Sequence, residues 1–427
     1  MQLHKFPPRR LIGAAALVGA AALIPAAASA ATAGSPAAPA RPVIAYVANS
    51  FGNTVTPINT VTNKAGTPIV VGTGPGQIAF TPNGKTAYVI TDGSVVPVNT
   101  ATGTALKPIK GTVGASYIAI TPNGKTAYVS YCCFEGSQNK LTPINTATNT
   151  VGKAITWQPG TAWGDSIAIT PNGKTVYIAS TAGTVTPVST ATGKAGKPIQ
   201  LGYMAENGNA YIAITPNGRT VYVTESGPYR PGDTITPISA ATNKAGKPIS
   251  VGQWPVAIAI TPNGKTVYVA STGSGPGGCA STDCVGPSPA AVPGSVPATV
   301  TPISTATNKP GKAIKIGPVG PPAGSMPYLA STLAITPNST TAYVAFGTSV
   351  IPIRTATNTS LKPIKVGGGL TSIAITPNGK TAYVTRDRHN SQAQGLLGFV
   401  IPINTTTDKA GQAIPVGDEP SAIAITP

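Results

Sequence analysis

Short stretches of alternating apolar and polar residues recur along the chain at a nearly constant interval. Each copy resembles IAITPNGKTAYV at 118–129 and predicts two strands joined by a turn, because Pro at the second turn position and Asn-Gly after it favour a tight hairpin. Two further pieces, VTPI and KPI, recur before the next copy, so each repeat predicts four short strands. The repeat tyrosines are flanked by apolar residues, and we expect them to pack between the repeats. They stand at positions 46, 88, 128, 177, 222, 268, 343 and 383.

The spacing of the repeat indicates its architecture. Successive tyrosines lie 40–49 residues apart, with one interval of 75 between Tyr268 and Tyr343. Four strands in a unit of this length are typical of a propeller blade. A solenoid is the competing architecture for any repeat, but its parallel coils would not need a hairpin turn at each TPNG. The pieces predict eight blades; seven would require one unit to be discarded, and the weakest unit has Ser339 in place of the turn glycine.

The two ends of the repeat array are complementary. VIAYVAN at 43–49 is a second strand with no first strand before it, and SAIAITP at 421–427 is a first strand with no second strand after it. If the array is a ring, the C-terminal strand joins the N-terminal blade as its innermost strand, which removes the edges of an open array. We therefore expect an all-β fold, a single β-propeller of four-stranded blades over residues 43–427, with an insertion at 272–298.

The N-terminal residues do not follow the repeat. Basic residues precede an apolar run at 11–24, which is too short to span a bilayer, and ASA at 28–30 has the small residues of a cleavage site. This pattern predicts a signal peptide at 1–30, a flexible linker at 31–42, and a secreted protein that is extracellular or associated with the cell wall. Arg9-Arg10 leaves a twin-arginine signal open as the alternative to an ordinary secretory signal. No later apolar run is long enough to predict a transmembrane segment.

The repeat resembles the YVTN β-propeller repeats of microbial surface and secreted proteins, whose unit runs roughly YVTN, VSVIDTATN, V-G-P and GVAVSPDG. Here YVAN stands at 46–49, INTATN at 144–149 and VGQWPVAIAITPNG at 251–264, and the resemblance covers about residues 43–427. Two features depart from the family: the acidic residue of the IDT step is absent, and a proline stands in every third strand. Because proline removes a donor from the strand ladder, we expect a bulge in each blade. The prolines are Pro57, Pro97, Pro143, Pro187, Pro237, Pro302, Pro352 and Pro402.

The turns of a four-stranded meander sort into two faces, with turns 1-2 and 3-4 on one and loops 2-3 and 4-1 on the other. The first, here named the lysine face, has one carboxylate, Asp408, and seventeen basic residues. The formal net charge is +18, and it becomes +15 (26 minus 11) without the three basic residues of 1–30. We expect this face to suit anionic wall polymers; nucleic acid fits less well, because the turns have no aromatic side chains to stack on bases. The basic residues are Lys64, Lys85, Lys107, Lys125, Lys153, Lys174, Lys194, Lys197, Arg219, Lys244, Lys247, Lys265, Lys309, Lys312, Lys362, Lys380 and Lys409.

The opposite face, here named the variable-loop face, has loops that differ from blade to blade. These loops hold all three tryptophans and the other ten carboxylates. Variable loops on a rigid scaffold are common binding sites, and aromatic rings are enriched in interfaces. We therefore expect this face to bind an unidentified protein or glycan partner; the alternative is that the rings only pack the loops down. The candidate binding residues are Trp157, Trp163, Tyr203, Tyr229 and Trp254.

Catalytic and metal-binding residues are sparse. After residue 30 the one histidine is His389, which leaves no pattern for a zinc site or a Ser-His-Asp triad, and no G-x-S-x-G, P-loop or dinucleotide fingerprint is present. Asp387, Asp418 and Glu419 would approach one another near the ring closure and are the remaining candidate for a metal or acid-base site. We expect a non-enzymatic, monomeric binding scaffold with no cofactor. The alternative, a propeller-fold hydrolase such as a lactonase, or a lyase, rests on analogy of fold.

The four cysteines stand as two close pairs in a chain predicted to be exported. CASTDC at 279–284 predicts a local disulfide between Cys279 and Cys284, because six residues fold back within bridging distance. Cys132 and Cys133 are adjacent. A strained vicinal disulfide, two free thiols, or a copper or zinc site remain open for that pair.

Overall fold

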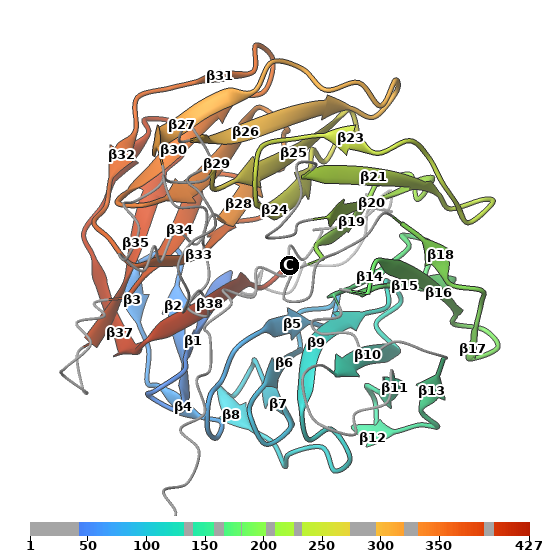
Figure 1. Ribbon diagram of the computed structural model, residues 1–427. Coiled ribbons are helices and arrows are strands. Elements are labelled where there is room, and N and C mark those ends of the chain that lie inside the picture. Colours follow the sequence, from blue (N-terminus) through green and yellow to red (C-terminus); the bar gives the residue numbers. More distant parts are fainter. Residues whose placement is uncertain are drawn as a thin grey trace, which may run out of the picture.

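Eight antiparallel sheets follow one another around a central axis (Figure 1). The computed structural model describes residues 42–131, 140–157, 166–180, 182–201, 210–225, 233–273, 296–319, 332–387 and 397–427. Every regular element in these ranges is a strand. The chain is an eight-bladed β-propeller, as the repeat count predicted.

The first two strands of every blade come from IAIT and TAYV. The innermost strands, numbered from the N-terminal blade onward, are β38 (Pro420–Ile425), β5 (Ile78–Phe80), β9 (Ala115–Ile120), β14 (Ser166–Ile169), β19 (Ile212–Ile214), β24 (Pro255–Ile260), β28 (Thr332–Ile335) and β33 (Leu370–Ile375). The second strands are β1 (Ile44–Asn49), β6 (Thr86–Ile90), β10 (Thr126–Tyr131), β15 (Thr175–Ser180), β20 (Thr220–Glu225), β25 (Thr266–Ser271), β29 (Thr341–Phe346) and β34 (Thr381–Arg386).

The third and fourth strands come from VTPI and KPI. The third strands are β2 (Thr54–Asn59), β7 (Val95–Asn99), β11 (Lys140–Asn145), β16 (Thr184–Ser189), β21 (Thr234–Ser239), β26 (Pro297–Ser304), β30 (Ser349–Arg354) and β35 (Leu397–Asn404). The outer edge is made by β3 (Lys64–Ala65) and β4 (Ile69–Val70), β8 (Thr104–Ala105), β12 (Thr150–Val151) and β13 (Ile155–Thr156), β17 (Lys194–Ala195) and β18 (Ile199–Gln200), β22 (Lys244–Ala245) and β23 (Ile249–Ser250), β27 (Ile314–Val319), β31 (Thr359–Ser360) and β32 (Ile364–Lys365), and β36 (Lys409–Ala410) and β37 (Ile414–Asp418).

The ring closes where the last strand pairs with the first. β38 runs antiparallel to β1, with Ala45 opposite Ile425 and Val47 opposite Ile423 (Figure 1). The Thr426 N–H donates to the Ile44 carbonyl at 2.9 Å, and the Ile44 N–H donates to Thr426 Oγ1 at 3.0 Å. The C-terminal strand is therefore the innermost strand of the N-terminal blade, which confirms the closure inferred from the complementary ends.

The third-strand prolines do not bulge the strands that hold them, so that expectation is wrong. Pro57 lies opposite Tyr46 in an unbroken register from Ile44 to Asn59. The interruption lies instead in the outer edge, where Gly66 separates β3 from β4 and donates its N–H to the Pro57 carbonyl at 2.7 Å. Because the N–H and C=O of a strand residue point to the same neighbour, the missing proline donor faces this break. A side chain at position 66 would meet the Pro57 ring at 3.3 Å, and the equivalent positions Leu106 and Leu361 show that the site accepts one.

The TPNGK turns take their positive φ at the glycine. In the blade of β5 to β8, Gly84 has a φ of 64° and donates its N–H to the Thr81 carbonyl at 2.8 Å. Asn83 acts through its side chain, because Oδ1 accepts bonds from the Thr81 hydroxyl at 2.8 Å and the Lys85 N–H at 3.0 Å. Ser339 takes the same conformation, with a φ of 62°, and its Oγ accepts the Asn263 N–H of the neighbouring blade at 3.0 Å. The weakest unit is thus a complete blade, and the count is eight rather than seven.

The repeat tyrosines pack between blades, as predicted, with exposed fractions of 0–5%. Most of their hydroxyls also donate a hydrogen bond to a side chain in the 3-4 turn of the next blade. The acceptor residues have φ values of 52–54°, a conformation that asparagine and aspartate adopt more readily than other side chains. This bond gives a structural reason for the Asn of TATN. The pairs are Tyr88–Asn149, Tyr177–Asn243, Tyr222–Asn308, Tyr268–Asn358, Tyr343–Asp408 and Tyr383–Asn63.

Candidate functional site

The two faces predicted from the turns are present in the structure. On the lysine face the 1-2 and 3-4 turns of one blade touch: the Thr100 hydroxyl donates to the Gly84 carbonyl at 2.6 Å, and Thr190 does the same to Gly173 at 2.6 Å. Turns of adjacent blades also pack together, since a side chain at Gly124 would lie 3.1 Å from the Pro82 ring. The lysine face is therefore a continuous ring of turns.

Trp254 lies at the variable-loop end of an innermost strand, directly before β24. Its side chain is half-buried, its φ is 57°, and its carbonyl accepts the Thr272 N–H at 3.1 Å. The equivalent residues are Gly114 before β9, Gly369 before β33 and Glu419 before β38, with φ values of 78°, 76° and 52°. A positive φ is natural for glycine but is an outlier for a bulky side chain, at a cost of about 1–3 kcal/mol. The fold therefore holds a tryptophan in an unfavourable backbone conformation beside the central axis.

Trp157 has a different environment. It follows β13 and is half-buried against the apolar cluster that joins two blades, which includes Tyr128, Leu141 and Ile178. This ring has a packing role, so the alternative that aromatic side chains pack the loops holds at least partly for Trp157. Trp163, Tyr203 and Tyr229 lie outside the described residues, and their binding role stays a prediction.

Other aromatic side chains near this face differ sharply in exposure. Phe51, in the loop between β1 and β2, is 63% exposed, whereas Tyr131 is 5% exposed. The Tyr131 hydroxyl donates to Thr142 Oγ1 at 3.0 Å, and the Lys140 ammonium lies 3.9 Å from the centre of the Tyr131 ring. Phe51 is thus available to a partner, and Tyr131 is a structural residue.

A buried carboxylate on this side was not foreseen from the sequence. Glu225 ends β20, is 6% exposed, and accepts a hydrogen bond from the Thr236 hydroxyl. The equivalent position holds Asn49 in β1, whose Nδ2 donates to Thr54 Oγ1 at 3.0 Å and to Thr56 Oγ1 at 2.9 Å. In these two blades the last residue of the second strand carries a polar group that pairs with threonines of the third strand, and the repeat pattern contains no signal for its burial.

The acidic candidates do not form a metal site in the part of the chain that the structure describes. No group of three or more His, Cys, Asp or Glu side chains is placed there to hold a metal ion. The carbonyls of Asp418 and Glu419 accept the N–H groups of Gly52 and Ser50, at 3.3 Å and 2.8 Å, so this segment helps to close the ring. His389 and all four cysteines lie outside the described residues, and the Cys279–Cys284 pairing stays a prediction.

The N-terminal segment and most of the insertion lie outside the described residues. Residues 1–41, which include the expected signal peptide and nearly all of the linker, lie outside the described ranges. So does most of the insertion, which falls between β25 and β26 on the variable-loop face. Among the described residues, no helix is long and apolar enough to cross a membrane.

Comparison with known proteins shows the fold. No family model and no curated protein matches the chain. A solved structure of dihydro-heme d1 dehydrogenase NirN in complex with DHE is similar, with a TM-score of 0.65, 13% identity, and coverage of 92% of this chain and 77% of that one. Kuenenia stuttgartiensis hydrazine synthase has a TM-score of 0.56 and 18% identity, over 78% of this chain and 96% of that one.

A third similar structure is a functionally unknown protein from Desulfotomaculum acetoxidans, with a TM-score of 0.53 and 16% identity over 76% of this chain and 97% of that chain. At such low identity, these likenesses extend to the propeller fold and not to activity or ligands. No family model supports the YVTN resemblance, so its support is limited to the repeat residues themselves.

Proposed function

We propose that this protein is a secreted, non-enzymatic β-propeller scaffold of the YVTN-repeat kind, which binds a protein or glycan of the cell envelope or extracellular space. The variable-loop face is the proposed binding face, and the scaffold acts as a monomer. The observation that carries the proposal is Trp254: a half-buried tryptophan at a φ of 57°, where the equivalent positions hold glycine before β9 and β33 and Glu419 before β38. Strain that persists at an accessible side chain is a common mark of a ligand contact.

The position of Trp254 suits this role. It precedes an innermost strand, so it lies near the axis, where the loops of several blades meet. A rigid aromatic side chain near the centre of an interface supplies apolar contact area at a low cost in conformational entropy. Trp163, Tyr203 and Tyr229 belong to loops of the same face and are proposed to surround it.

Trp254→Gly tests the proposal, because glycine keeps the backbone conformation and removes the ring. The free energy of unfolding should stay equal or rise by about 1 kcal/mol, since glycine relieves the strain. Sedimentation with an envelope preparation of the producing organism at high salt should fall about tenfold or more, because apolar contacts are not screened. Val61→Ala, which truncates an exposed side chain on the lysine face, is the matched control and should bind like wild type.

Trp254→Phe separates the ring from the strain. It keeps an aromatic side chain and the positive φ, so it should retain part of the binding without the gain in stability. Wild-type retention of Trp254→Gly at high salt would refute the proposed role of this face.

A further inference from the structure

The lysine face has a strong, unbalanced positive charge. All seventeen basic residues named for it are exposed. Its carboxylate, Asp408, accepts a hydrogen bond from the Tyr343 hydroxyl at 2.7 Å and lies between two blades. Burial, together with the hydrogen bond and the charge of Asp408, raises the pKa of Tyr343, which keeps this hydroxyl protonated as the donor.

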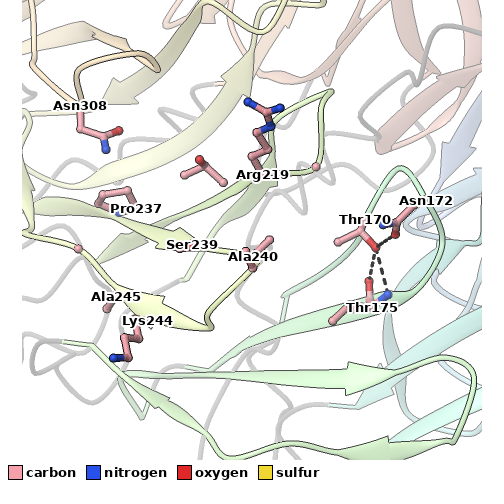
Figure 2. A pocket seen from close by; sticks show the side chains of 14 residues that line it. Thr170, Asn172, Thr175, Arg219, Pro237, Ser239, Ala240, Lys244, Ala245 and Asn308 are labelled. Carbon is pink, nitrogen blue, oxygen red and sulfur yellow. Dashed lines mark hydrogen bonds between the residues drawn. The ribbon is translucent and has the colours of Figure 1, made fainter.

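An open groove lies on this face at the junction of three blades (Figure 2). It has a cavity volume of about 680 Å³. One wall is the turn at 170–175 and the other is the edge of the next blade, made by β20, β21 and β22, with Asn308 of a third blade at its end. Figure 2 shows Arg219 and Lys244 on either side of β21, the strand that carries Pro237 and Ser239.

The polar groups that line the groove are mainly donors. Arg219 and Lys244 bring two positive charges, and no carboxylate lines the groove. Asn172 Oδ1 accepts the Thr170 hydroxyl at 2.7 Å and the Lys174 N–H at 3.0 Å, and Asn308 Oδ1 accepts the Tyr222 hydroxyl. With both amide oxygens engaged, each amide presents its NH₂ group to a ligand. An anion is the ligand that this set of donors fits.

We infer that the lysine face is a docking surface for a linear polyphosphate, with the groove between β14–β18 and β19–β23 as its anchoring site. The planar guanidinium of Arg219 matches the geometry of a phosphate. From the groove, Lys174 and Lys265 in the adjacent 1-2 turns continue the basic ring in both directions, so a polymer of repeated charges gains more than a single anion.

The chemistry of the turns favours a polymer without bases. The TPNGK and TATNKAGK turns carry no aromatic residue, and single-stranded nucleic acids gain much of their affinity from stacking on aromatic rings. This inference concerns a surface other than the proposed binding face. It stands or fails independently of Trp254.

Titration with long-chain inorganic polyphosphate at low salt tests the inference, using mature protein and a double variant, Arg219→Gln with Lys244→Gln. The double variant should bind about tenfold more weakly, and its dependence of log Kd on log salt should be shallower by about 1–2, because two phosphate contacts are lost. The glutamines keep a polar side chain and remove the charge, and thermal melting should be unchanged.

Two further double variants remove the same net charge elsewhere. Lys110→Gln with Lys365→Gln changes exposed lysines near the start of the third strands, at the opposite end of the blades. This double variant should bind within about twofold of wild type. Lys85→Gln with Lys380→Gln changes the lysine face away from the groove and should give an intermediate loss. Equal losses in all three would show attraction by net charge alone and overturn the inference.

Single-stranded oligo-dT of the same total charge as the polyphosphate is the last ligand to be compared. We expect it to bind more weakly than polyphosphate, because it gains no stacking on this face. If oligo-dT binds as tightly as polyphosphate or more tightly, the surface is a nucleic-acid site and the inference is wrong.

Discussion

The lysine face repeats one pair of turns in nearly every blade, whereas the variable-loop face changes from blade to blade. On the lysine face, five of the six TPNG turns are closed by the same two bonds, from the threonine hydroxyl to the asparagine Oδ1 and from the glycine N–H to the threonine carbonyl. These bonds recur at Thr81, Thr121, Thr170, Thr215 and Thr376. At the other end of the same strands, the last residue of the second strand differs from blade to blade: Asn49, Ile90, Tyr131, Ser180, Glu225, Ser271, Phe346 and Arg386.

The difference shows how a repeat fold separates folding from recognition. Local side-chain bonds shape the lysine face, so its turns leave little freedom and present the same charge many times. The variable-loop face is released from that requirement, and there an unusual residue such as Trp254 is tolerated at a positive φ. Identical turns thus suit a repetitive ligand, and divergent loops suit a specific one.

Both faces depend on one closed ring, and removing the closing strand should have the largest effect. Deletion of residues 421–427 takes away β38, with its ladder to β1 and the buried side chains of Ala422, Ile423 and Ile425. The expected loss is on the order of 5 kcal/mol, enough to lower the melting temperature of the whole molecule. Thermal melts of the mature and truncated proteins measure it, and identical melting would contradict the closed ring.

High pH should act next most strongly, because it attacks the tyrosines between blades. Burial raises the pKa of Tyr88, Tyr222, Tyr268 and Tyr383 from 10 to about 12. Between pH 10 and about pH 12, the tyrosines of the unfolded chain release protons that those of the folded chain keep. The contribution of these tyrosines to the free energy of unfolding is therefore constant below about pH 10 and falls as the pH rises towards 12. Chemical denaturation across pH 8–12 should show this fall.

Tyrosinate absorbance provides the control for the pH effect. The buried tyrosines should deprotonate together with the loss of circular dichroism. Titration of all tyrosines near pH 10 with the fold intact would contradict their role between the blades.

A smaller effect should come from adding the hydrogen bond between a repeat tyrosine and the TATN asparagine in a blade where glycine replaces that asparagine. Gly193 occupies the TATN asparagine position, has a φ of 61°, and has no atom closer than 3.9 Å to an added Cβ. Gly193→Asn should place an acceptor near the hydroxyl of Tyr128, as Asn149 does for Tyr88, and raise the free energy of unfolding by about 0.5–1 kcal/mol. Urea denaturation measures the gain.

The same substitution combined with Tyr128→Phe tests the cause of that gain. The hydroxyl is absent in this background, so the gain should shrink. A gain of equal size in both backgrounds would mean that the change acts on the unfolded chain and not through a bond between blades.

Much of the scaffold was predictable from the sequence because each blade repeats the same information. The strand pattern, the hairpin turns, the complementary ends and the tyrosine packing all follow from one motif read many times. The sequence did not show where the prolines interrupt the sheet, because the position of the break depends on which neighbouring strand the missing N–H of Pro57 faces. That is set by the register of the folded sheet.

The candidate sites were less predictable. Trp254 was selected as an aromatic loop residue, but its backbone strain appears only when it is placed beside Gly114 and Gly369 in the three-dimensional repeat. The groove at Arg219 and Lys244 joins residues from separate turns and an asparagine of a third blade. Trp157 was selected on the same grounds as Trp254, and its packing between blades became visible only in the structure.

The claim that the two faces bind different partners is tested most directly by one crossed experiment. Wild type, Trp254→Gly and the double variant Arg219→Gln with Lys244→Gln are each measured against polyphosphate at low salt and against the envelope preparation at high salt. We predict that Trp254→Gly loses only envelope binding and that the double variant loses only polyphosphate binding. If either variant weakens both interactions to a similar degree, or if neither variant weakens any, the two-face account is contradicted.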